Sequence, residues 1–387
     1  SSKGASDASV NVGAEATGID GGTDDDVISN QGLLAIEATS TGSVNATSNV
    51  NADVTFGGAS SKAMSDASAA RRAMALGIDG GQGADVITNQ DRLRVLATSD
   101  GTVTSRSHAN ADATFGSTSS STVTAAAAEG AAASAGISSG SGDDKITNLG
   151  YVDSIAEAKL NVSSSSVSIS DSTFGDAYAA AVSVSTAQGK ADSTGVSADE
   201  GNDTIENEGV INVQASSTTT VNSITAAIAD STFGDAHTVA KSANFAAGET
   251  TAKGLSAGKG KDEILNSELI SVEADNTVAV NALTVSSSGP AYSNAGTYAL
   301  ANARGIDGGT DEDGVLNADT VFVKAKPRIL SATRTFGSGG NVDGKVGIRL
   351  NAAATGISGG EGDDSISNDG NVLVFVGIQE TGSSVSE

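Results

Sequence analysis

The sequence contains no cysteine and no tryptophan, and only 2 prolines and 2 methionines among its 387 residues. Without cysteine the chain forms neither disulfides nor thiolate metal sites. Aromatic residues make up 3% of the chain, so a conventional globular core would be poorly filled. That composition favours close packing of sheets through small side chains. No apolar run approaches the roughly 20 residues that a membrane-spanning helix needs, so we expect no membrane insertion.

Basic residues are also scarce. The sequence has 21 Lys and Arg against 47 Asp and Glu, which gives a formal net charge of −26. Such a chain repels the phosphates of nucleic acids and attracts cations, so we expect no nucleic acid among its partners. A surface protein without disulfides fits a bacterial exterior. We therefore expect a secreted bacterial protein, located outside the cell or at the cell surface.

The chain does contain a long internal repeat. A turn written GIDGGQGADVITN at 77–89 recurs in related forms, and an aspartate and an asparagine stand eight and twelve positions after its first glycine. The first glycines are spaced by 59 residues and then by 51: Gly18, Gly77, Gly136, Gly195, Gly254, Gly305 and Gly356. We interpret residues 1–387 as a single repeat array, with shortened, irregular repeats over 289–387.

A second motif, Thr-Phe-Gly, recurs with the same 59-residue spacing. It contains Phe56, Phe115, Phe174 and Phe233, and we place Tyr292 and Phe336 in the same column, that is, at the equivalent position of later repeats. We interpret this motif as a tight arc, in which the phenyl rings plug the wide end of a thin core.

Between the Gly/Asp turn and the Thr-Phe-Gly motif, small or apolar residues alternate with polar ones, which is the period of a β-strand. The alanine-rich segment 123–135 suits a helix by propensity. However, the next repeat holds Val182, Val184 and Thr186 in the same columns, which favours a strand. Around Pro327 the inward-facing parity switches, which predicts a bulge.

Two folds satisfy this pattern. In a parallel β-solenoid each repeat is one wide coil, and equivalent residues stack at about 4.8 Å. In an antiparallel meander each repeat is a hairpin, and equivalent residues lie two strands apart. We predict the first, an all-β, parallel β-solenoid. It would be a wide, flattened β-roll of seven coils, with two long sheets joined by the Gly/Asp turn and the Thr-Phe-Gly arc.

The turn chemistry decides between these folds. Residues 80–87 and 359–366 fit the pattern G-G-x-G-x-D-x-U. This pattern resembles the calcium-binding repeats of haemolysin-type (RTX) proteins, which form parallel β-rolls with such a turn about every nine residues. The resemblance covers about nine residues of each repeat and implies calcium ions held between stacked turns.

Calcium takes about six to eight oxygen ligands, more than one turn offers, whereas two stacked turns supply enough. The candidate metal ligands are Asp20, Asp24, Asp25, Asp26, Asp79, Gly81, Gly83, Asp85, Asp143, Asp144, Asp203, Asp307, Asp311, Asp313, Gly360, Gly362, Asp363 and Asp364. In the fifth repeat the ammonium groups of Lys259 and Lys261 could replace a metal ion, so we expect no strong metal site there. The alternative is that these are ordinary polar turns, which Gly and Asp also favour.

Two further columns carry polar groups. The asparagine column fits a structural ladder of side-chain amides better than a set of ligands. Asp171 with Asp176, and Asp230 with Asp235, flank the arc and are a candidate second cation site.

We predict that the chain is not an enzyme. The segment 136–140 matches G-x-S-x-G, but the column of Ser138 holds aspartate in other repeats. The two histidines, His108 and His237, occupy unrelated columns. The acid and base clusters of solenoid lyases are missing as well.

These features predict a calcium-stabilised extracellular structural protein, as a subunit or segment of a filament, sheath or surface layer. Its partners would be calcium ions and either identical copies stacked head to tail or the rest of a longer array. Leu373 and Phe375 put apolar groups on the normally polar face of the last coil, which supports an end interface. The alternatives are a calcium-dependent adhesin stalk and an ice- or glycan-binding face.

Overall fold

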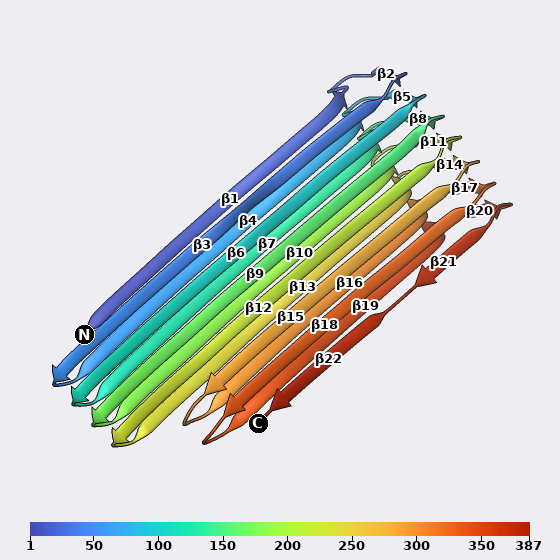
Figure 1. The fold of residues 1–387 in the computed structure, drawn as a ribbon. Coiled ribbons are helices and arrows are strands. Elements are labelled where there is room, and N and C mark those ends of the chain that lie inside the picture. The colour runs from blue at the N-terminus through green and yellow to red at the C-terminus, as the bar shows by residue number, and fades with distance from the viewer.

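The computed structural model describes all 387 residues, which form β-strands and the short turns between them and no helix. One long sheet runs along the whole array (Figure 1). Its strands lie in this order: β1 (Ser2–Asp20), β4 (Ala59–Asp79), β7 (Thr118–Ser138), β10 (Ala177–Ser197), β13 (Ala236–Lys259), β16 (Ala291–Thr310) and β19 (Val342–Glu361). The strand prediction for the alanine-rich segment 123–135 is confirmed, because it lies within β7.

The second long sheet packs against the first. Its strands are β3 (Leu34–Phe56), β6 (Arg92–Phe115), β9 (Tyr151–Phe174), β12 (Ile211–Phe233), β15 (Ile270–Ser286), β18 (Val321–Gly337), β21 (Val372–Val376) and β22 (Gln379–Ser386), the last two of which both pair with β18. Neighbouring strands are parallel and pair residues one repeat apart, as Ile78 does with Ile137. The predicted parallel β-solenoid of seven coils is therefore confirmed, and the antiparallel meander is excluded.

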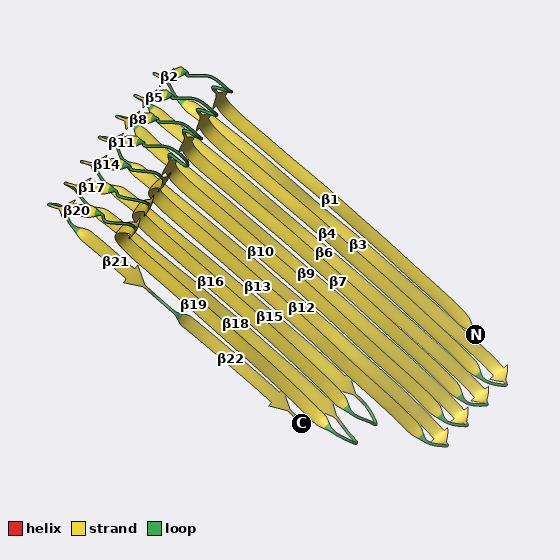
Figure 2. Cartoon of the chain, turned by 180° about the vertical axis from the view of Figure 1, so that it is seen from behind, coloured by secondary structure: helices red, strands yellow, loops and turns green.

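A third, narrow sheet, which we did not predict as separate from the turns, closes one end of the coils (Figure 2). It contains β2 (Val27–Asn30), β5 (Val86–Asn89), β8 (Lys145–Asn148), β11 (Thr204–Asn207), β14 (Glu263–Asn266), β17 (Gly314–Asn317) and β20 (Ser365–Asn368). Each of its strands follows a Gly/Asp turn. Isoleucines of this sheet, such as Ile87 and Ile146, point into the core and are fully buried.

The core is thickest at this turn end. The largest hydrophobic cluster there contains 37 buried residues, among them the isoleucines, leucines and valines beside the turns. Toward the arc the clusters shrink to a few alanines. Buried hydroxyls pair across the two sheets in that region, as Ser120 and Ser168 do with their Oγ atoms 2.6 Å apart. The Gly/Asp turns thus lie beside the largest apolar cluster of the molecule.

The arc differs from the prediction. The rings of Phe56, Phe115, Phe174 and Phe233 stack with centroids 5.1, 5.0 and 4.9 Å apart. They do not plug the core, because the Phe56 side chain is 75% exposed and the others are exposed as well. The glycine after each ring, such as Gly57 with φ +103°, reverses the chain at once and leaves the ring outside the tip.

Tyr292 and Phe336 do not belong to this column. Tyr292 pairs with Lys241, and Phe336 pairs with Val285. Both residues fall outside the column because of the position at which the shorter repeats lack residues. Strand β15 ends at Ser286, which pairs with Ala227, whereas β12 continues to Phe233. The residues lost from the shorter repeats therefore come from the arc, and these coils end earlier than the others (Figure 2).

The predicted bulge at Pro327 is also wrong. Buried and accessible residues alternate along β18 without a switch, and Pro327 keeps a buried, inward position. It pairs in register with Asn276 of the neighbouring strand. Since proline lacks only the amide hydrogen, the strand loses one donor and keeps its direction.

Candidate metal centre

The first glycine of every Gly/Asp turn is required by close packing. A Cβ atom on Gly77 would lie 2.9 Å from Leu93 Cδ1 and would collide with the carbonyl oxygen of Gly136 in the next coil. Two later glycines of the motif act differently. Gly81 and Gly83 have φ values of +100° and +127°, which side-chain-bearing residues rarely adopt. The turn therefore reverses the chain within a few residues and brings its carbonyl groups close to the neighbouring turns.

The aspartates eight positions after the first glycine form one continuous column, which we call the aspartate ladder. Its members are Asp26, Asp85, Asp144, Asp203, Asp262, Asp313 and Asp364. The backbone amide of each of the first six donates a hydrogen bond to the Oδ1 atom of the next, at 2.7–3.0 Å. One carboxylate oxygen of each residue from Asp85 onward thus stabilises the backbone of the preceding turn.

The second oxygen of these carboxylates has no such role. In Asp85, Asp144, Asp203, Asp262 and Asp313 the Oδ2 atom is buried and has no hydrogen-bond partner. Burial raises the pKa of Asp203 to about 7 and that of Asp262 to about 6. It also raises the pKa of Asp144 and of Asp313. A buried carboxylate oxygen without a partner is costly unless a proton or a cation neutralises it.

Glycine lies directly beside the Oδ2 atom of the ladder aspartate in four of the coils. A Cβ atom on Gly80 would lie 2.6 Å from Asp85 Oδ2, and one on Gly308 would lie 2.8 Å from Asp313 Oδ2. Gly21 and Gly359 occupy the same position beside Asp26 and Asp364. The third, fourth and fifth coils hold Ser139, Ala198 and Ala257 there. The space around the carboxylate is therefore most open in the first, second, sixth and seventh coils.

Other predicted ligands lie on the outer side of the turns. Asp25 Oδ1 accepts a hydrogen bond from the amide of Ala84 at 2.8 Å, and Asp143 Oδ1 accepts one from the amide of Asn202 at 2.8 Å. Asp24 and Asp363 are exposed. Burial raises the pKa of Asp79, and the nearby charges of Asp20 and Asp199 raise it further. These carboxylates are crowded, which favours a cation near them.

Three predicted features of the later coils contribute less. Asp307 is held by an ion pair with Arg304, so its charge is already compensated. Asp311 occupies a left-handed turn position, with φ 84°, that glycine fills in most other coils. Lys259 and Lys261 pair with Glu200 and Glu312 on the exposed surface, and they leave the oxygen of Asp262 without a partner.

No group of three or more His, Cys, Asp or Glu side chains converges on one point in the structure. A calcium ion at these turns would therefore combine ladder carboxylates of neighbouring coils with backbone carbonyl oxygens, a mixture that calcium accepts. The residues that fit this requirement best are Asp26 and Asp85, with the turn backbone at Gly81 and Gly83. Asp313 and Asp364, with Gly360 and Gly362, form the equivalent pair in the last two coils.

The asparagine column is a structural ladder, as predicted. Each side chain donates from Nδ2 to the Oδ1 atom of the next coil, at 2.6–2.8 Å from Asn30 through to Asn368. Because the amides bond to each other, they are not available as metal ligands.

The candidate second cation site near the arc is less developed. Asp171 lies in a column with Asp112 and Asp230, and burial and these two charges raise its pKa. Asp176 belongs to another column, where its Oδ1 accepts a hydrogen bond from the amide of Asp235 at 3.1 Å. The two columns are not brought together into one set of ligands.

Arg71 is a buried basic residue that the repeat pattern did not lead us to expect. Its side chain is 3% exposed and lies between the long sheets, where Nη2 donates to the carbonyl oxygen of Gly42 at 2.8 Å. Nε and Nη1 have no partner, and burial lowers the pKa of the guanidinium. The facing glycines Gly42 and Gly101 provide the space for it. A basic residue at an inward position of the alternating pattern was the available signal.

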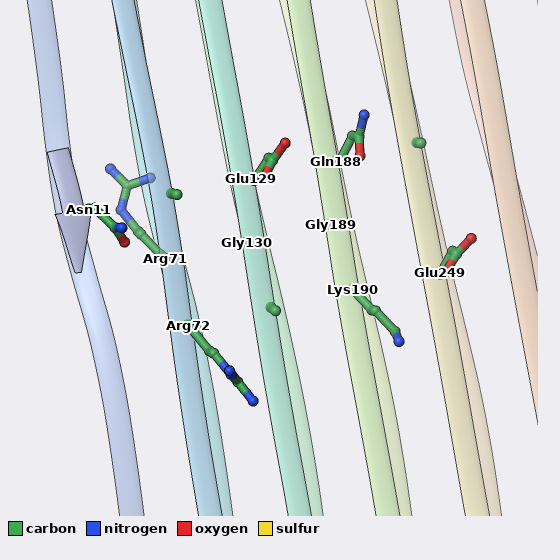
Figure 3. Close-up of a pocket in the computed structure, with 12 residues that line it drawn as sticks. Asn11, Arg71, Arg72, Glu129, Gly130, Gln188, Gly189, Lys190 and Glu249 are labelled. Carbon is green, nitrogen blue, oxygen red and sulfur yellow. The ribbon is translucent and has the colours of Figure 1, made fainter. Parts of the chain in front are cut away.

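A shallow hollow of about 320 Å³ lies over the same strands (Figure 3). The labelled side chains come from neighbouring strands, with Gly130 and Gly189 between them. Its charged residues are of both signs: Arg71, Arg72, Glu129, Lys190 and Glu249. The hollow therefore shows no preference for a ligand of one charge.

The three parallel sheets and the stacked turns define the chain as a parallel β-solenoid, which is a structural repeat type. Comparison with protein-family models, with curated proteins and with solved structures finds no match in any of the three. No helix long and apolar enough to cross a membrane occurs in the structure.

Proposed function

We propose that this protein is a calcium-stabilised structural solenoid of the bacterial cell exterior, serving as a subunit or segment of a filament, sheath or surface layer. The observation that supports calcium is the row of buried Oδ2 atoms without partners, one in each coil from Asp85 to Asp313. The calcium-binding turns of haemolysin-type proteins, which the motif resembles, supply the chemical precedent.

Calcium would supply positive charge where the turns stack. The chain carries a formal charge of −26, and the aspartate ladder places a carboxylate in every coil, about 4.8 Å from the next. Many core residues are alanine, serine and threonine, so hydrophobic burial gives only moderate stabilisation per residue. An ion that binds the folded state alone stabilises it by RT ln(1 + [L]/Kd) for each site. Folding would then be favoured outside the cell, where calcium is plentiful.

A structural role also agrees with the backbone. The chain forms 291 backbone hydrogen bonds, and most of them join neighbouring coils along the array. Ser138 of the G-x-S-x-G segment donates to Asp199 Oδ2 in the turn of the next coil at 3.0 Å, as a structural hydroxyl does. We therefore propose that the protein is not an enzyme.

The flat face of the second long sheet does not favour an ice-binding role. Thr39 pairs with Thr98, which pairs with Glu157, and Ser216 and Asp275 follow in the same column. A regular lattice binder requires the same residue in each coil. An adhesin stalk would share the proposed structural chemistry.

The test is a calcium titration of chelator-treated protein, followed by circular dichroism and thermal melting. We expect the β-signal and the melting temperature to rise with calcium in the natural protein. The gain should shrink in Asp85→Asn, which removes one ladder charge but keeps an oxygen for the Asp26 amide. Asp66→Asn, an exposed site on β4 outside both aspartate columns, is the matched control and should keep the full gain. Equal melting temperatures in chelator and in calcium would refute the calcium proposal.

A further inference from the structure

The fourth and fifth coils differ in length at the arc, and this difference leaves a step within the array. Strand β12 pairs with β15 only as far as Ala227, and β13 pairs with β16 only from Ala240 onward. Residues 228–239 of the fourth coil, which we call the step, therefore have a neighbouring coil on one side only (Figure 1). The step arises from the internal change of the repeat from 59 to 51 residues.

The step carries main-chain donors that lack a backbone partner. In the third coil the amides of Gly175 and Ala177 donate to carbonyl oxygens of the fourth coil, at 3.0 and 2.9 Å. The equivalent amides of the fourth coil, those of Gly234 and Ala236, have no backbone acceptor. An edge of this kind accepts a further strand by the same main-chain pairing.

The base of the step is closed by the short loop of the fifth coil. The amide of Ala229 donates to Ser287 Oγ at 3.0 Å, and the amide of Ser288 donates to Thr238 Oγ1 at 3.0 Å. This loop goes no further along the step, and residues 230–237 around the arc are exposed or half-buried. The open part of the edge therefore lies next to the arc.

An aromatic ring is uncovered at the step. Phe233, the last ring of the stack, is 63% exposed, whereas Phe115 and Phe174, which each lie between two rings, are 43% exposed. Ile228 is exposed as well. The step thus offers a free ring face on which a further aromatic side chain can stack.

The charged residues of the step are acidic. Asp230 and Asp235 are both exposed, and residues 228–239 contain no lysine, arginine or proline. Natural proteins often place lysine or proline on an edge strand to prevent its pairing with another chain. The step has neither, and its carboxylates favour a partner with basic side chains. A second copy of this chain, with its net charge of −26, does not fit that requirement.

We propose that the step is a docking site for an extended, basic segment of another protein, which pairs with the free edge and places an aromatic side chain on Phe233. In parallel pairing, its basic side chains would lie about 4.8 Å from Asp230 and Asp235. Each arm of the step is about 20 Å long, which suits a strand of ordinary length. The inference goes beyond the structural function proposed above and does not depend on calcium.

The probe is a synthetic peptide of residues 228–239 that carries Asp230→Lys and Asp235→Lys, labelled with a fluorophore. Its affinity for the full chain is measured by fluorescence anisotropy. We expect the lysine peptide to bind about tenfold more tightly than the same peptide with its natural aspartates, because two like-charge pairs become opposite-charge pairs. Added salt should reduce this difference.

Variants of the full chain locate the bound peptide. Asp230→Lys together with Asp235→Lys in the chain should reverse the preference, so that the aspartate peptide binds more tightly. Phe233→Ala should weaken binding of the lysine peptide by about two- to tenfold. The matched control is Phe56→Ala, which removes an exposed ring of the first coil and should leave binding unchanged. Circular dichroism and thermal melting establish that each variant is folded.

Three results would overturn the proposal. No measurable binding of the lysine peptide at low salt would show that the step does not accept a strand. Equal affinity for the two peptides would show that the carboxylates of the step do not select a basic partner. Equal weakening by Phe233→Ala and Phe56→Ala would show that the peptide does not bind specifically at the step. The comparison of the two peptides on the natural chain needs no variant, so it stands even where a variant fails to fold.

Discussion

The amide of Asp85 donates a hydrogen bond of 2.7 Å to the carboxylate of Asp144, a residue 59 positions later in the chain. This bond joins two turns and also fixes the carboxylate in a buried place. One carboxylate oxygen of Asp144 thus stabilises the backbone of the neighbouring turn, and the other is buried without a hydrogen-bond partner. The turn edge is consequently the part of the coil most sensitive to protons and cations.

Removal of calcium should give an unusual dependence of stability on pH. Burial raises the pKa of Asp203 to about 7 and that of Asp262 to about 6, from 3.8. A carboxyl group with a raised pKa in the folded state destabilises that state when it ionises. In chelator the protein should therefore become more stable as the pH falls from about 8 to 5.

The variant Asp203→Asn should flatten this profile and be more stable than the natural chain at pH 8, by about 2 kcal/mol. Thermal melting across this pH range in chelator measures the effect. Asp66→Asn, with an exposed side chain on β4, should leave the profile unchanged. A natural protein that gains stability from pH 5 to 8 in chelator would contradict the prediction.

Substitution of the first glycine of a turn should be costly. In Gly77→Ala the new methyl group meets the carbonyl oxygen of Gly136 and the side chain of Leu93. We expect a loss of about 1–3 kcal/mol, measured by denaturant unfolding. The control is Gly13→Ala, since a Cβ atom there has no atom within 4 Å. That variant should be neutral or slightly more stable, and equal losses in both would argue against the packing explanation.

The asparagine ladder should contribute strongly to stability in its middle. Asn148 accepts from Asn89 at 2.8 Å and donates to Asn207 at 2.7 Å, and it is fully buried. Asn148→Ala leaves a donor and an acceptor without partners, so we expect a loss of about 2–4 kcal/mol in thermal or denaturant unfolding. Asn368→Ala, on an exposed side chain, should cost less than about 1 kcal/mol.

Replacement of the buried arginine, Arg71, by an apolar residue should stabilise the protein. Arg71→Met keeps much of the side-chain volume and removes a guanidinium with two nitrogen atoms that lack partners. We expect a gain of about 1–3 kcal/mol, because the cost of burying an uncompensated charge disappears. Arg72→Met, which changes the exposed neighbour, should have an effect within about 0.5 kcal/mol. A large loss in Arg71→Met would instead indicate that a bound anion compensates the charge.

Much of the fold could be predicted from the sequence, because a fixed period and a fixed parity leave few arrangements. Residues such as Ile78 and Ile137 had to stack once the turns were aligned, and the asparagine column had to form a ladder. The narrow third sheet was not predicted, since strands such as Val27–Asn30 are too short to show alternation.

The arc could not be predicted in detail for a different reason. The position of the Phe56 ring depends on the left-handed conformation of Gly57, which the pattern of residue types does not fix. Tyr292 was misplaced because the spacing alone does not show where a shorter repeat loses residues. The environment of Arg71 depends on Gly42 in the facing sheet, and only the packing of the two sheets brings them together.

The earlier ending of the later coils makes the solenoid a body of unequal width. In the wide coils the strand extends to the phenylalanine of the arc, as β12 does at Phe233, whereas β15 of a narrow coil already ends at Ser286. The step between wide and narrow coils makes one direction along the stack differ from the other, so an image of the particle would show which way its coils run.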